Sequence, residues 1–177
     1  NADKDEAIID NDNAALELND QIRYKWLEFY KVNFKGDWYQ RIWQKLVLRA
    51  NTEFGFLGAY NEKAGIVPFE RFYVGGDGMG NFTLDGRDIV ALRGYENQSV
   101  TPWVINDVTG QYGQEGAVIY NKFSLELRYP ITLKPSASIY ALTFLEAGNS
   151  FAKFSDFDPF AVKRSAGVGV RIFMPAF

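Results

Sequence analysis

Alternation of apolar and polar side chains at every second residue constrains this chain more than any other feature. Residues 42–58 show it most clearly, with Ile42, Leu46, Leu48, Ala50, Phe54 and Phe56 on one parity and Lys45, Arg49, Asn51 and Glu53 on the other. Because successive side chains of a strand point to opposite faces, the run predicts a strand with one apolar and one charged face. It is longer than the ~5–6 residues that are usual for a strand.

Four further runs predict long strands, at residues 23–35, 118–131, 138–148 and 164–174. In the run 118–131, the apolar parity includes Phe123, Leu125 and Leu127, and the polar parity includes Lys122, Ser124, Glu126 and Arg128. In the run 23–35, one parity holds Tyr24, Trp26, Tyr30, Val32 and Phe34. In the run 164–174, Val168 and Val170 alternate with Gly167, Gly169 and Arg171. No helical period appears, so the chain is expected to be all-β and antiparallel, with about five long strands.

The connections alternate between short and long. Short turns are expected at Gly36–Tyr39 and at 130–135, and long connections at 59–117 and 149–163. Long strands joined in this way are typical of an outer-membrane β-barrel, in which the apolar parity faces lipid. The alternative is a soluble sandwich that buries the apolar parity between two sheets. About eight strands are needed to close a barrel, so the strands at 23–35 and 164–174 are not expected to pair with each other.

Composition removes several classes of function. The chain has no Cys and no His, which excludes thiol catalysis, histidine-based catalysis and most zinc sites. We therefore expect no enzymatic activity, no cofactor and no metal. The net charge of −3 gives no basic field for nucleic acid. Aromatic residues make up 16% of the chain, which suits strands and membrane interfaces, and no apolar run reaches the ~18 residues of a membrane-spanning helix.

A candidate site centres on Arg93, in the segment Leu92-Arg93-Gly94-Tyr95 of the long connection. Arginine is permanently charged, and inside a protein its fork of donors needs carboxylates. Two downstream strands each offer a lone carboxylate, Glu126 and Glu146. We expect the guanidinium to lie within ~2.7–3.2 Å of one or both.

The same connection carries a glycine-rich run that begins at Gly75 and Gly76. A phosphate-binding loop would require a Lys-Ser or Lys-Thr ending followed by a helix, and neither is present. The two glycines are therefore predicted to form a loop turn.

Taken together, the segments 71–76, 92–95 and 124–127 resemble the surface-antigen region of the Omp85 superfamily, over roughly residues 20–177. The resemblance implies that Arg93, Gly94 and Tyr95 form the tip of the sixth extracellular loop, which folds into the barrel lumen, and that Glu126 and Glu146 are its partners on the barrel wall. Leu92 stands where the family usually has Val or Ile, and Glu146 where it often has Asp.

The resemblance also implies an architecture. Residues 21–177 would form the tenth to fourteenth strands of a transmembrane barrel of about sixteen strands, with 59–117 as the lumen-inserted loop and 1–20 as an acidic extracellular loop. The remaining strands and the periplasmic POTRA domains would lie outside this sequence.

The function implied is that of an insertase in the outer membrane of a Gram-negative bacterium. Such a protein inserts other outer-membrane proteins by non-covalent strand templating and membrane perturbation. Its partners would be outer-membrane lipid, client outer-membrane proteins and accessory assembly lipoproteins, without nucleic acid. Two alternatives remain open: an Omp85-type secretion transporter, and a structural or receptor barrel with a plugged lumen.

Overall fold

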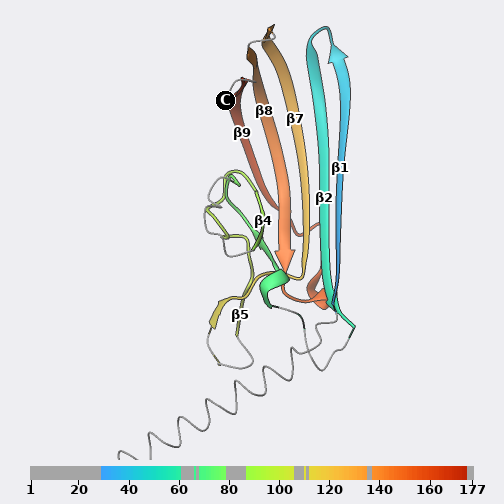
Figure 1. Ribbon diagram of the computed structural model, residues 1–177, viewed down its shortest axis with the longest axis vertical. Coiled ribbons are helices and arrows are strands. Elements are labelled where there is room, and N and C mark those ends of the chain that lie inside the picture. The colour runs from blue at the N-terminus through green and yellow to red at the C-terminus, as the bar shows by residue number, and fades with distance from the viewer. Residues whose placement is uncertain are drawn as a thin grey trace, which may run out of the picture.

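A computed structural model describes residues 29–60, 66, 68–78, 87–105, 110, 112–134 and 137–174. Five long strands form one antiparallel sheet in the order β1-β2-β7-β8-β9 (Figure 1). Their bounds are Phe29–Trp43 for β1, Leu46–Ala59 for β2, Ile119–Lys134 for β7, Ala137–Phe151 for β8 and Lys163–Phe173 for β9. The predicted all-β, antiparallel fold is thus confirmed.

The register of the sheet gives its two faces. Arg49 pairs with Glu126, Glu126 with Phe144, and Phe144 with Gly167, so these four residues belong to one face of the sheet. We call this face, which also carries Glu146, the inner face, and the opposite face the outer face.

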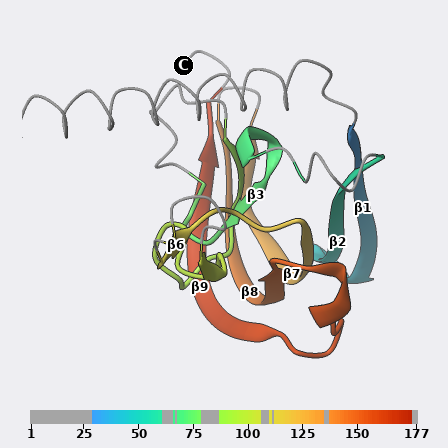
Figure 2. The same ribbon diagram turned by 90° about the horizontal axis from the view of Figure 1, so that it is seen from below.

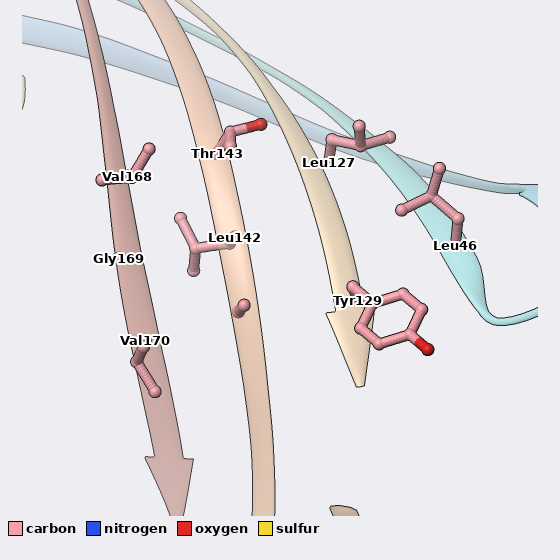
Figure 3. A pocket seen from close by; sticks show the side chains of 9 residues that line it. Leu46, Leu127, Tyr129, Leu142, Thr143, Val168, Gly169 and Val170 are labelled. Atoms are coloured by element: carbon pink, nitrogen blue, oxygen red, sulfur yellow. The ribbon is translucent and has the colours of Figure 1, made fainter. Parts of the chain in front are cut away.

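The next set of cross-strand partners belongs to the outer face and is largely apolar. Leu48 pairs with Leu127, Leu127 with Thr143, and Thr143 with Val168. Figure 3 shows part of this surface, an open apolar hollow that crosses β2, β7, β8 and β9. The alternation predicted for β2, β7 and β9 therefore corresponds to the two faces of the sheet.

The long connection between β2 and β7 packs against the inner face. It contains the 3-10 helix η1 (Pro68–Glu70) and four short strands, β3 (Phe72–Val74), β4 (Asp88–Val90), β5 (Trp103–Ile105) and β6 (Tyr112–Gln114). β3 pairs parallel with β4, and β5 pairs antiparallel with β6. Phe72 and Leu92 from this connection are fully buried in one core with Leu57 of β2 and Tyr120 of β7. Burial of these apolar groups holds the connection on the sheet.

The connection between β8 and β9 contains a second 3-10 helix, η2 (Phe154–Asp156). It runs along the other side of the sheet from β3 (Figure 2). Among the described residues there is no helix long and apolar enough to cross a membrane.

The turn predicted at Gly36–Tyr39 is wrong. These residues continue β1, where Gly36 pairs with Thr52 and Asp37 pairs with Asn51. The chain turns instead at Gln44 and Lys45, and Gln44 takes the positive φ of 39° that the reversal requires. Lys45 therefore lies in the turn and not on the inner face. A glycine followed by an aspartate suggested a turn, but the side chain of Arg49 on the neighbouring strand donates a hydrogen bond to the Asp37 carboxylate, and this contact supports the extended conformation.

Other boundaries differ by a few residues. β7 runs through Pro130, where the register shifts before Thr132, and ends at Lys134. Residues 23–28 of the first predicted strand, with Tyr24 and Trp26, lie outside the described residues, as does the segment 1–20.

The sheet has two edges, β1 and β9, which lie at opposite ends of the strand order. They do not pair with each other within the described residues, as predicted. The described sheet is a single curved layer whose outer face is not packed on a second sheet, so the sandwich alternative is not observed.

Candidate loop-docking site

Arg93 lies just after β4, at a point where the backbone of the connection folds back on itself. The amide of Gly76 donates to the carbonyl of Tyr95 at 3.1 Å, and the carbonyl of Gly76 accepts from the amide of Leu92 at 2.9 Å. Gly76 has φ +84°, which favours glycine, and a Cβ there would lie 1.9 Å from Oδ1 of Asn97 and would displace that side chain. Gly75 and Gly76 thus form the expected turn, which presents Arg93 and Gly94 to the sheet.

Arg93 contacts both predicted acids, but Glu146 takes the larger share. Glu146 accepts three hydrogen bonds from it, from the backbone amide at 2.8 Å, from Nε at 2.9 Å and from Nη2 at 2.6 Å. Glu126 accepts one, from Nη2 at 2.7 Å. Glu146 therefore holds both the side chain and the main chain of the loop tip, a charge-assisted arrangement of high geometric specificity.

The two carboxylates more than offset the effect of burial on the pKa of Arg93. Burial alone would lower the pKa of the guanidinium, but hydrogen bonds and charge interactions, with Glu146 first and Glu126 next, raise it above its ordinary value. The arginine remains fully charged in the docked loop.

Glu126 has a wider role than the sequence suggested. Its side chain is fully buried and forms ion pairs with arginines of four different segments: Arg49 of β2 at 3.5 Å, Arg93 at 2.7 Å, Arg171 of β9 at 3.3 Å, and Arg128 of β7. Within the described part of the chain, Glu146 forms an ion pair with Arg93 alone. Removal of Arg93 would thus leave Glu126 neutralised and Glu146 without a cation.

Two further contacts support the loop tip, and sequence reasoning missed them. The guanidinium of Arg93 lies over the ring of Phe144, 3.9 Å from its centroid. That ring in turn covers Gly167, where a Cβ would lie 2.5 Å from it. The register of β8 and β9 brings these residues beside Glu126, and strand periodicity alone does not reveal register.

The next two residues of the loop bind β9. Gly94, at φ +88°, approaches Ser165 so closely that a Cβ would lie 2.9 Å from the Cβ of Ser165. The hydroxyl of Tyr95 donates to the carbonyl of Arg164 at 2.8 Å. Arg93, Gly94 and Tyr95 therefore contact three strands of the sheet: β7, β8 and β9.

A second anchor of opposite polarity holds the other side of the connection, and it too was not predicted. Lys31 of β1 forms ion pairs with Glu70 at 3.1 Å and Asp88 at 3.2 Å, and its ammonium lies 4.9 Å from the centroid of the Phe72 ring. The cation here belongs to the wall and the acids belong to the connection. The sequence signal for this anchor was the pair of lysines, Lys31 and Lys35, on the polar parity of the first strand.

The arrangement as a whole is suited to holding a loop. Its charged groups neutralise one another, and no group of three or more potential metal ligands occurs among the described residues. Its contacts are ion pairs and hydrogen bonds that join the long connection to the sheet.

Comparison with known proteins places this geometry in a family. The model of the Omp85 superfamily domain matches residues 13–177. Among solved structures, the chain is similar to the crystal structure of BamA from Haemophilus ducreyi lacking POTRA domains 1-3, at a TM-score of 0.59 and 20% sequence identity. The match covers 81% of this chain and 29% of that chain, so this chain spans less than a third of the BamA chain that it matches. At this identity the likeness shows the fold alone.

The search of curated proteins returned no match. The family model nevertheless covers nearly the whole sequence, including both docking acids and the loop tip. The chain belongs to the Omp85 superfamily.

Proposed function

We propose that this chain is part of an outer-membrane insertase of a Gram-negative bacterium, which folds and inserts other β-barrel proteins. The process is non-covalent: the barrel offers strand edges as templates and perturbs the surrounding lipid. The observation that carries the proposal is the docking of Arg93 on Glu146 and Glu126, on a sheet of this superfamily.

Membership of the superfamily supports an outer-membrane location. The outer face agrees with it, because large apolar side chains such as Val168 and Val170 are 81% and 61% exposed there. Exposed apolar area of this extent is unfavourable in water and favourable against lipid.

We further propose that the sheet is one section of a closed barrel, completed by strands outside these residues. The support is the pair of edges at β1 and β9, since an unpaired strand edge does not persist in hydrocarbon. POTRA domains and accessory assembly lipoproteins would bring client chains to this barrel.

Reconstitution tests the proposal. The full protein would be placed in phospholipid vesicles and supplied with a urea-unfolded client barrel, and the client's insertion would be measured by protease protection. Insertion above that of empty vesicles, and its loss in Arg93→Ala, is the expected result. A protein that instead moves a soluble passenger into the vesicle lumen would be a secretion transporter, and one that does neither would be a structural barrel.

A further inference from the structure

The connection between β8 and β9 covers one end of the outer face, on the side of the sheet opposite the docked loop (Figure 2). Two outer-face asparagines hold it there. Asn121 of β7 donates to the carbonyl of Pro159 at 3.0 Å, and Asn149 of β8 donates to the carbonyl of Ala161 at 2.6 Å. We call residues 152–162 the collar.

An aromatic cluster joins the collar to two strands. Phe157 packs edge-on against Phe56 of β2 and Phe151 of β8, with ring centroids 6.4 Å and 5.4 Å apart. Asn121 beneath the collar is completely buried. The collar is thus seated on the outer face itself and does not extend freely from the strand ends.

The collar lies where the outer face stops being apolar. From Leu125 and Leu145 toward the turns, outer-face residues are mostly aliphatic or aromatic, whereas toward the loops the register brings first Arg164 and then Asn121 and Asn149. A charged side chain facing lipid costs about 2–4 kcal/mol at the bilayer midplane and about 0–1 near the interfaces. On the proposed function, on which this inference rests, the collar therefore lies at the level of the lipid headgroups.

One side chain of the collar is presented outward by a rigid turn. The side-chain carboxylate of Asp158 accepts a hydrogen bond from the backbone amide of Phe160 at 2.9 Å, and the backbone carbonyl of Asp158 accepts one from the amide of Ala161 at 3.2 Å. Pro159 fixes the intervening φ. Phe160 is 86% exposed and lies between Pro159 and Ala161, whose carbonyls accept hydrogen bonds from the outer-face residues Asn121 and Asn149.

A cationic side chain lies four residues after this phenylalanine, at the same end of the sheet. Arg164 is exposed and has the outer-face parity of β9, where it pairs with Ala147. An aromatic side chain beside Lys or Arg matches the boundary of a bilayer, where the ring enters the acyl region and the cation meets phosphate.

We propose that the collar binds the phosphate-bearing headgroup layer of the bilayer, with Phe160 inserted at the boundary between headgroups and acyl chains. It would set the height at which lipid contact ends on β2, β7 and β8.

Spin labels on single cysteines test this proposal in the full protein, prepared without other cysteines and reconstituted in vesicles of phosphatidylcholine and phosphatidylglycerol. The variants are Phe160→Cys, Val168→Cys on the outer face as the lipid control, and Lys45→Cys in the exposed turn as the water control. Each label is scored by relaxation with oxygen, which concentrates in lipid, and with a soluble nickel complex, which stays in water.

The expected label at 160 reports a shallow lipid position, with an oxygen-to-nickel ratio between those at 168 and 45. A ratio at 160 equal to that at 45, while 168 reports lipid, overturns the collar proposal and leaves the proposed membrane location intact. A label at 160 shielded from both reagents overturns it in favour of a protein contact. A water-like ratio at 168 contradicts the membrane location, and the collar proposal fails with it.

Discussion

The two acids that hold Arg93 are not equivalent. Glu146 bonds three donors of Arg93, including its backbone amide, and has no second cation within the described structure, whereas Glu126 also binds Arg49, Arg128 and Arg171. Release of the loop would therefore expose an uncompensated charge at Glu146 only. We infer that Glu146 decides whether the loop is docked and that Glu126 holds the strands of the wall together.

Substitution of each acid separates these roles. Glu146→Gln should free the loop and increase its rate of proteolysis at least about tenfold, since each ~1.4 kcal/mol changes an equilibrium tenfold and breaking a buried pair costs about 3–5 kcal/mol. The side chain of Arg93 is 22% exposed, which favours the lower end of that range. Glu126→Gln should instead lower the melting temperature of the barrel. Equal loop release by both substitutions with an unchanged melting temperature would contradict the assignment.

Gly167 supports the loop without touching its charged groups. A Cβ at Gly167 would lie 2.5 Å from the ring of Phe144, on which Arg93 is stacked. Gly167→Ala should displace the ring and raise loop proteolysis severalfold. The matched control is Gly169→Ala on the same strand and face, where a Cβ would meet Leu142 at an ordinary 3.8 Å. If both substitutions raise loop proteolysis equally, the effect comes from replacing any glycine of β9 and not from the contact between Gly167 and Phe144.

At the scale of the element, the long connection is held at two points of opposite polarity. Arg93 carries a cation to acids on β7 and β8, while Lys31 of β1 presents a cation to Glu70 and Asp88 of the connection. The anchors lie on opposite halves of the sheet. Each one restricts a different part of the connection.

Lys31→Met should therefore loosen the segment around β3 and β4 and leave the Arg93 contact in place. Faster amide hydrogen exchange at 72–74 and 88–90, with unchanged exchange at Arg93, is the expected pattern. Lys35→Met on the same face of β1 is the control, because Lys35 is 65% exposed and its ion pair with Glu53 is long, at 3.6 Å. The two-anchor description fails if Lys31→Met and Lys35→Met change exchange equally.

Strand alternation predicted the five long strands and gave the faces of β2 and β7, because one face of these two strands is charged or polar and the other is apolar. It placed Arg49, Lys122, Glu126 and Arg128 on one face, and Leu125, Leu127 and Val168 on the other. It failed at Gly36–Tyr39, since a Gly-Asp pair is also compatible with a strand when a partner strand supplies Arg49 for the aspartate. Local preference was overridden there by cross-strand pairing.

The site was predicted in part. The resemblance to the superfamily named Arg93, Glu126 and Glu146, and the structure brings all three together. It did not indicate Phe144, Gly167 or Lys31, because their roles depend on register and on packing between distant segments. Parity tells which face a residue occupies, but only the pairing of strands tells which residues are neighbours.

At the scale of the whole molecule, the two edges of the sheet matter most. Within the proposed barrel, β1 and β9 should each pair with strands outside these residues. Hydrogen exchange of the full protein should then be slow at consecutive amides along both strands. Fast exchange at alternate amides of β1 or β9 would reveal an unpaired edge in the complete protein and contradict the barrel.

On the proposed function, docking of the loop through Arg93 and Glu146 is required for insertion of client barrels. A double-mutant cycle tests it, with client insertion into vesicles measured for Arg93→Ala, Glu146→Ala and the double variant, and with Arg93→Lys as a partial substitute that lacks the planar fork. We expect both single variants to insert clients poorly, the double variant to be no worse than Arg93→Ala, and Arg93→Lys to insert clients at a level between Arg93→Ala and the wild type. Wild-type insertion by Arg93→Ala with a demonstrably released loop would contradict it.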